Sequence, residues 1–174
     1  MPPAALFRPL IGLLDDMRSM IDRLDETGYA APAPGRSSGG IGGHVRHCLD
    51  HVSALVTATR TGLCAYDRRA RGTDIESCRF AALQRIADLE RALSWLGSTC
   101  LQAPVEVETQ IDADGSTFVT TSTVGREVVF VTSHTIHHNA IIAHLLKVRG
   151  VDMGSRFGLA PSTPSRDERL ACAR

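Results

Sequence analysis

Two histidines four residues apart, His134 and His138, have the spacing in this chain that best suits metal binding. Four residues exceed one turn of an α-helix by about 40°, so both imidazoles lie on one face, roughly 5–6 Å apart. Neutral imidazole binds zinc, nickel, copper and ferrous iron, and a catalytic site of this kind usually takes a third protein ligand from elsewhere. A second cluster, His44, His47 and His51, offers that ligand. The spacing predicts a histidine site for one metal ion, shared by two segments.

Four segments of the chain repeat apolar residues at steps of three and four. We expect amphipathic helices over residues 6–24, 41–61, 80–96 and, from a cap at Ser122 or Thr123, up to Gly150. Between the third and fourth helices, residues 105–121 alternate apolar and polar around the turn sequence 112–115. This alternation predicts a small hairpin or extended excursion. The predicted fold class is therefore all-α, with one interruption.

Both histidine clusters fall on helices that we expect to form the core. His138 lies on the apolar stripe of the last helix, with His134 beside it, and the other three histidines share one side of helix 41–61. Burying an imidazole without a partner costs on the order of 1–3 kcal/mol. Two such stripes that converge inside a bundle are a common setting for a metal site.

Length and composition limit the possible classes of protein. The 174 residues, 43% of them hydrophobic, suffice for a single domain spanning 1–174, in which 151–174 form an extended C-terminal tail. Nineteen basic and nineteen acidic residues balance, so we expect no nucleic-acid partner and no anionic membrane surface. No apolar run approaches the roughly eighteen residues that span a bilayer. Five cysteines without a Cys-x-x-Cys spacing favour a cytoplasmic location.

Three motifs resemble those of the DinB-like (DinB/YfiT) family of metal-dependent enzymes. They are the segments 41–51 (IGGHVRHCLDH), 122–127 (STVGRE) and 133–138 (SHTIHH), and the resemblance covers roughly residues 5–160. It implies an up-down-down-up four-helix bundle that is frequently a homodimer.

The same resemblance implies one divalent metal ion, zinc, nickel or iron, bound by His47, His134 and His138. His51 is the alternative to His47, because it shares the same stripe one turn along. Three neutral imidazoles leave open coordination positions, where a bound water can reach a pKa of about 7 or a thiol can bind as thiolate. The catalytic residues stay unassigned, since Asp50 and Glu127 are more typical of solvated or ligand-orienting carboxylates than of a general base.

The predicted function is accordingly that of a DinB-like, divalent-metal-dependent hydrolase or low-molecular-weight-thiol S-transferase. Its substrate would be a small molecule, with a thiol among the candidates. The alternatives are a helical bundle that binds a metal or a small ligand without catalysis, and an interaction module whose histidines are structural.

A homodimer is expected through one face of the last helix. Residues 128–131 of this helix are consecutively apolar, and four more apolar side chains follow at Ile141, Ile142, Leu145 and Leu146. A helix that is apolar over most of its circumference is usually covered on more than one side. The hairpin or the tail around Phe157 of the same chain is one possible cover, and a second copy of the chain, related by a two-fold axis, is the other. The family resemblance favours the second copy.

Overall fold

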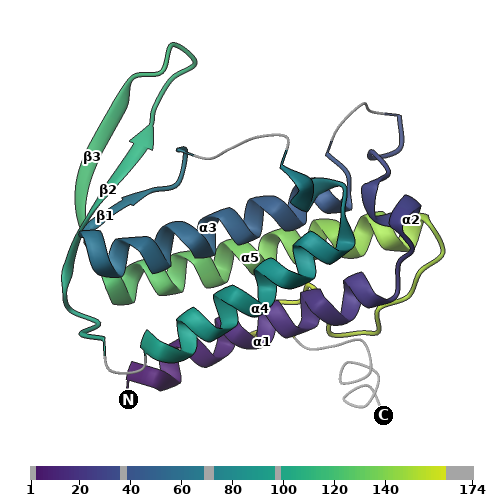
Figure 1. The fold of residues 1–174 in the computed structure, drawn as a ribbon, viewed down its shortest axis with the longest axis horizontal. Coiled ribbons are helices and arrows are strands. Elements are labelled where there is room, and N and C mark those ends of the chain that lie inside the picture. Colours follow the sequence, from purple (N-terminus) through teal and green to yellow (C-terminus); the bar gives the residue numbers. More distant parts are fainter. Residues whose placement is uncertain (1–2, 36–38, 69–72, 97–98, 164–174) are drawn as a thin grey trace.

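Four long helices form the body of the protein. The computed structural model describes residues 3–35, 39–68, 73–96 and 99–163. Its long helices are α1 (Pro3–Asp22), α3 (Ile41–Thr61), α4 (Arg79–Trp95) and α5 (Val124–Val148). They contact one another in a closed ring, in the order α1, α5, α3 and α4, so that α3 and α5 run side by side (Figure 1). The short helix α2 (Glu26–Ala30) contacts α3, and the 3-10 turn η1 (Asp74–Glu76) contacts α3 and α4.

The core lies between the four long helices because each presents an apolar stripe to the others. Side chains that are almost fully buried include Phe7, Leu10, Leu14, Met17, Ile41, Leu49, Leu55, Ile86, Leu93, Val128, Val131 and Ile142. Residue-specific caps set the ends of the two helices that carry the histidines. Gly62 ends α3 in the left-handed region, with φ of 75°, and the side chain of Thr123 accepts the backbone N–H of Arg126 in the first turn of α5.

A three-stranded mixed sheet accompanies the helices, so the prediction of an all-α, up-down-down-up four-helix bundle is wrong. The strands are β1 (Leu63–Ala65), β2 (Pro104–Gln110) and β3 (Thr117–Thr123), in the order β1-β2-β3. β1 pairs parallel with β2, and β2 pairs antiparallel with β3. Together with the five α-helices of the described residues, this sheet makes the fold a mixture of helix and strand.

β1, the strand that makes the sheet mixed, is not predicted from the sequence. This strand has only three residues and follows directly after Gly62, so it is too short to show an alternating pattern. Its partner residues are far away in the sequence, as in the pair Leu63 and Glu106. Such a non-local pairing depends on how α3 is placed against the hairpin, which local periodicity does not encode.

The segment expected as a hairpin or extended excursion forms β2 and β3, which rise away from the helices at the end of the bundle where α3 leads into β1 (Figure 1). The turn is organised by the Asp112 carboxylate, which accepts the backbone N–H groups of Asp114 and Ser116 at 3.0 and 2.9 Å. Gly115 takes φ of 91°, a conformation that favours glycine. The hairpin therefore has a well-defined turn and a face that it can present to α5.

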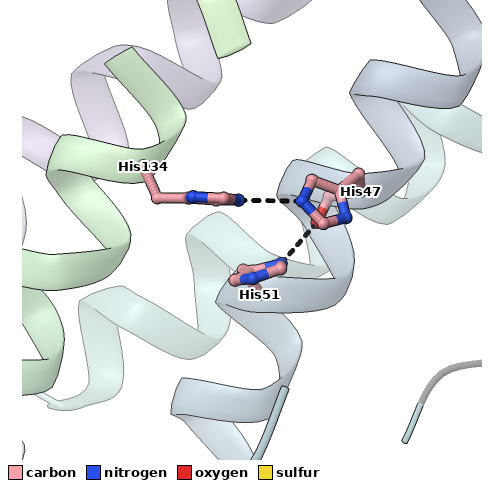
Figure 2. Close-up of side chains that lie close together, drawn as sticks. All are labelled: His47, His51 and His134. Carbon is pink, nitrogen blue, oxygen red and sulfur yellow. Dashed lines mark hydrogen bonds between the residues drawn. The ribbon is translucent and has the colours of Figure 1, made fainter. Parts of the chain in front are cut away.

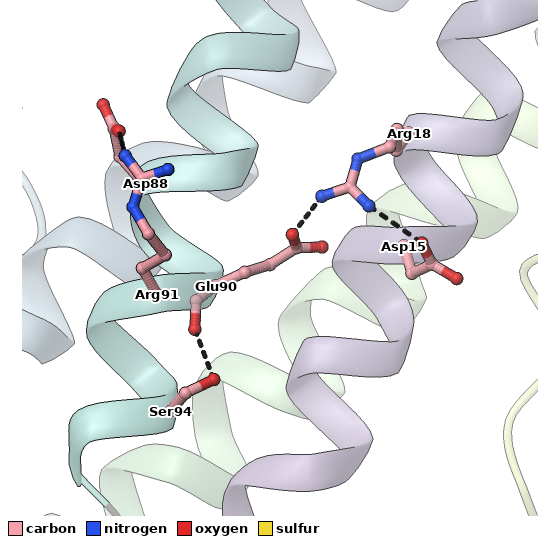
Figure 3. A network of polar contacts seen from close by, with 6 residues as sticks. All are labelled: Asp15, Arg18, Asp88, Glu90, Arg91 and Ser94. Carbon is pink, nitrogen blue, oxygen red and sulfur yellow. Dashed lines mark hydrogen bonds and ion pairs between the residues drawn. The ribbon is translucent and has the colours of Figure 1, made fainter.

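Polar contacts join α1 to α4 on the side of the bundle opposite the histidines. Arg18 of α1 donates to Asp15 of the same helix at 3.1 Å and forms an ion pair with Glu90 of α4 (Figure 3). Ser94 donates to the backbone oxygen of Glu90 at 2.8 Å. Because these groups are partly exposed, they contribute little to stability and mainly align the two helices.

The chain after α5 packs back on the bundle without regular structure as far as residue 163. Val151, Met153 and Phe157 contact the core, and residues 164–174 of the predicted tail lie outside the described residues. Among the described residues, no helix combines the length and the apolar character that a membrane span requires.

Candidate metal centre

The two histidine clusters meet where α3 packs against α5. α3 carries His44, His47 and His51, and α5 carries His134 and His138. Steps of three and four residues keep each set on one side of its helix. Ring centroids of His47 lie 4.9 Å from His134 and 4.5 Å from His138. The structure therefore brings all three predicted ligands, His47, His134 and His138, into one group of imidazoles.

Three of these side chains form the tightest set of ligand atoms. His47, His51 and His134 each offer one ring nitrogen, and these atoms lie within 4.8 Å of one another. Nε2 of His134 lies 2.8 Å from Nε2 of His47 (Figure 2). Two nitrogens that share a tetrahedral zinc ion, at about 2.0–2.1 Å each, are roughly 3.3 Å apart. One separation is shorter than that value and the others are at most 4.8 Å, so small movements of the side chains would let the three nitrogens hold a single ion.

The backbone orients His51 for this role. Its Nδ1–H donates to the backbone oxygen of His47 at 2.9 Å, since a carbonyl can only accept (Figure 2). The proton is thereby held on Nδ1, which leaves the lone pair of Nε2 available to a metal. The ring of His51 also stacks on that of His134, with centroids 4.2 Å apart.

His138 lies at the edge of this set and faces a different partner. Its Nδ1 is 2.9 Å from Nδ1 of His44, one turn before His47 on α3. Its ring remains close to the set, 4.6 Å from His134 between centroids. The geometry thus groups His51 with His47 and His134. The sequence prediction instead names His138 as the third ligand.

Burial keeps the outer pair of imidazoles neutral. Burial, and after it the charges of the neighbouring imidazoles, His134 first, together lower the pKa of His138 to about 3. Burial also lowers the pKa of His44, with His137 contributing in the same direction. Only neutral imidazole binds a metal, so these side chains do not have to lose a proton at neutral pH.

We expect the metal-free protein to lose stability on acidification because of His138. Its pKa is lower in the folded chain than the ordinary value of 6.5, so between about pH 6.5 and 3 the unfolded chain binds a proton that the folded chain does not. The free energy of unfolding therefore decreases as the pH is lowered through this window. The side chain is only partly buried, and screening by solvent reduces the expected loss to about 1 kcal/mol between pH 6.5 and 4.5. Urea unfolding at several pH values measures it, and a His138→Gln variant should show a flatter dependence.

A buried carboxylate supports the centre from the side of the sheet. Glu127 is fully buried on α5 and accepts hydrogen bonds from Tyr66 at 2.7 Å, Ser122 at 2.6 Å and Arg126 at 2.8 Å. The ring of Tyr66 stacks on His51, with centroids 5.0 Å apart and planes 14° apart. Glu127 therefore positions Tyr66, and Tyr66 positions His51.

Sequence reasoning missed Tyr66. The residue follows β1, and only the pairing of β1 with β2 places it between Glu127 and His51. Of the two carboxylates considered as a general base, Glu127 has its oxygens occupied by three donors, and Asp50 forms an ion pair with Arg46 at 3.0 Å. Both carboxylates therefore have partners within the protein, and the catalytic residues stay unassigned.

A Tyr66→Phe substitution is expected to destabilise the protein by about 1–3 kcal/mol, because one oxygen of the buried Glu127 carboxylate loses its donor. Tyr29→Phe is the matched control, since the Tyr29 hydroxyl donates to an uncharged acceptor, the backbone oxygen of Ile75, at 2.6 Å. That change should cost only about 0.5–1.5 kcal/mol. Urea denaturation of both variants measures the difference in free energy of unfolding. Equal losses of stability would mean that the hydrogen bond from Tyr66 to the buried Glu127 carboxylate is worth no more than one to a neutral carbonyl.

Comparison with known proteins links the chain to a larger protein. No family model matches it. No solved structure matches it. A curated protein from Rhizopus delemar, named FK506-binding protein 5, is 35% identical to it over 116 residues, which are 66% of this chain. The chain spans 30% of the length of this relative.

This likeness corrects the predicted function. The matching protein is named for the binding of FK506, so the prediction of a DinB-like hydrolase or low-molecular-weight-thiol S-transferase is wrong. The description as a four-helix bundle fails separately, because of the three-stranded sheet. The resemblance of residues 5–160 to DinB-like proteins stays a prediction. What the comparisons add is that this chain is similar to part of an FK506-binding protein from a fungus.

Proposed function

We propose that this chain is a metal-binding protein related to a segment of FK506-binding protein 5, and that it binds one divalent transition-metal ion between α3 and α5. The observation that carries the proposal is the convergence of ring nitrogens from His47, His51 and His134 within 4.8 Å. Imidazole ligands favour zinc, nickel or ferrous iron over calcium or magnesium. Three protein ligands also leave a coordination position open for a small molecule.

Metal analysis of the purified protein tests this proposal. The protein should be prepared without a histidine tag, stripped with a chelator and titrated with zinc and, separately, with cobalt. One equivalent should bind, and cobalt should give the visible absorption of a site with nitrogen ligands. Absence of stoichiometric binding of either ion would refute the proposal.

The likeness to FK506-binding protein 5 favours a second candidate function, the binding of FK506. A mostly apolar groove of about 280 Å³ lies between α1, α5 and the tail. It is lined by Leu6, Pro9, Val129, Thr132, Ser133, Ile136, Ala160 and Pro161. Calorimetric titration with FK506, with and without bound metal, tests this candidate. A flat titration in both states would eliminate it for this chain.

A homodimer through α5 also remains a proposal. Val129 is 56% exposed, although Val128 and Val131 beside it are buried. We expect the wild-type protein to sediment at about twice the monomer mass of 18.7 kDa, and Val129→Lys to shift it toward the monomer by placing a charge in the contact. Val148→Lys is the control, because Val148 is equally exposed at the other end of the same helix. A monomeric wild-type protein at micromolar concentration would contradict the dimer.

A further inference from the structure

A cavity of about 420 Å³ lies between the β2–β3 hairpin and the first turns of α5, next to the histidine centre. Tyr66 and Phe130 form the wall that separates the two. The Phe130 ring stacks on His134 at 5.8 Å between centroids and approaches His51 at 6.4 Å. A molecule in this cavity would therefore be one side chain away from the proposed metal ligands. The volume is within the usual range for small-molecule sites, about 300–1,000 Å³.

The cavity offers mainly hydrogen-bond donors, and the only carboxylate in its lining is already occupied. Glu127 accepts from Tyr66, Ser122 and Arg126, so its oxygens are not available to a ligand. Arg126 uses Nη1 for this bond, and its remaining nitrogens have no hydrogen-bond partner among the described residues. Its side chain is 64% exposed. The guanidinium can therefore still bind an anion through two parallel N–H groups.

Hydroxyl groups and apolar surface complete the lining. Thr109 and Thr120 place their side chains on the same face of the sheet as Val107, because residues two apart on a strand share a face and Thr120 pairs with Val107. The Thr120 hydroxyl has no hydrogen bond within the described residues. Val107 and Phe130 provide apolar contact close to the guanidinium, whose central carbon is 5.2 Å from the Phe130 ring centroid.

From this arrangement we propose that the hairpin cavity binds a small carboxylate with a compact apolar body. The carboxylate pairs with the Arg126 guanidinium and accepts a hydrogen bond from Thr120, while the apolar body contacts Val107 and Phe130. The inference rests on the proposed function only in placing this ligand beside a bound metal ion. Recognition by Arg126 itself requires no metal.

Benzoate and its neutral analogue benzamide test the proposal by calorimetry, on both zinc-loaded and chelator-treated protein. Benzoate should bind in both states, and benzamide at least about tenfold more weakly, because it lacks the charge that Arg126 recognises. Arg126→Gln should weaken benzoate at least about tenfold. Arg68→Gln is the matched control. Arg68 pairs with Glu108, which lies on the opposite face of β2 from Val107, so its loss should leave benzoate affinity within about twofold.

A second pair of variants avoids disturbing the buried Glu127. Thr120→Val removes one exposed hydroxyl from the cavity and should weaken benzoate about threefold. Thr117→Val, on the same strand but outside the cavity, should have no effect. Equal binding of benzoate and benzamide, or unchanged benzoate affinity in both Arg126→Gln and Thr120→Val, would overturn the proposal. Benzoate binding that appears only with zinc and ignores Arg126 would overturn it too, since the carboxylate would then be a metal ligand. A failure of zinc to bind would leave the Arg126 comparison intact, so the two proposals can fail separately.

Discussion

Replacing His51 with Ala should lower the affinity of the protein for zinc or cobalt by about a hundredfold or more. Loss of a group that merely orients a metal ligand typically costs about 10–100-fold in affinity, so loss of the ligand itself should cost at least as much. His134→Ala should have the same effect, because both side chains belong to the set of nitrogens that lies within 4.8 Å. Competition titrations against a chromophoric chelator measure affinities over this range.

His44→Ala and His138→Ala decide between the geometric and the sequence-based ligand sets. The two rings meet at 2.9 Å between their Nδ1 atoms, at the edge of the centre. If His47, His51 and His134 bind the ion, His44 and His138 at most orient these ligands, so both variants should lose less affinity than His51→Ala, within the roughly 10–100-fold typical of such neighbouring groups. A large loss with His138→Ala and none with His51→Ala would reverse the assignment and favour the set named by the sequence.

The choice between His51 and His138 could not be made from spacing alone. On α3, both His47 and His51 belong to one stripe, and on α5 both His134 and His138 do. Which three converge depends on the rotation of each helix and on side-chain rotamers. In this protein, the bond from His51 to the backbone of His47 and the stacking of Tyr66 on His51 set that orientation. Neither contact leaves a pattern in the sequence.

Local sequence patterns likewise predict some elements of the fold, whereas others depend on contacts between residues far apart in the sequence. The long helices α1, α3, α4 and α5 follow from apolar periodicity, and the alternation over residues 105–121 follows the strands of the hairpin. β1 and Tyr66 depend on pairing across more than forty residues, as between Leu63 and Glu106. Local patterns predict elements, whereas the sheet that positions the wall of the histidine centre arises only from packing.

The second large effect is expected at Gly42, where α3 begins. A Cβ atom added at Gly42 would lie 2.0 Å from the backbone oxygen of Glu76 in η1, and 3.1 Å from the Tyr29 ring. Because a backbone carbonyl cannot rotate away as a side chain does, η1 or the first turn of α3 would have to move. Gly42→Ala should therefore destabilise the protein by about 2–3 kcal/mol, in the range for overpacked sites. The same shift should weaken metal binding, since His44 and His47 follow within two turns.

Gly43→Ala is the matched control for this change. An added Cβ at Gly43 meets nothing within 4 Å, and alanine has the higher helix propensity by about 1 kcal/mol. We therefore expect Gly43→Ala to be neutral or stabilising in urea denaturation, in contrast to its neighbour. A similar loss of stability in both variants would mean that flexibility at the start of α3, rather than the close approach of η1, is what the glycines provide. If Gly42→Ala left stability unchanged, the contact between α3 and η1 would have to be looser than the structure shows. The position of His44 and His47 relative to α5 would then depend only on the packing of α3 against α5.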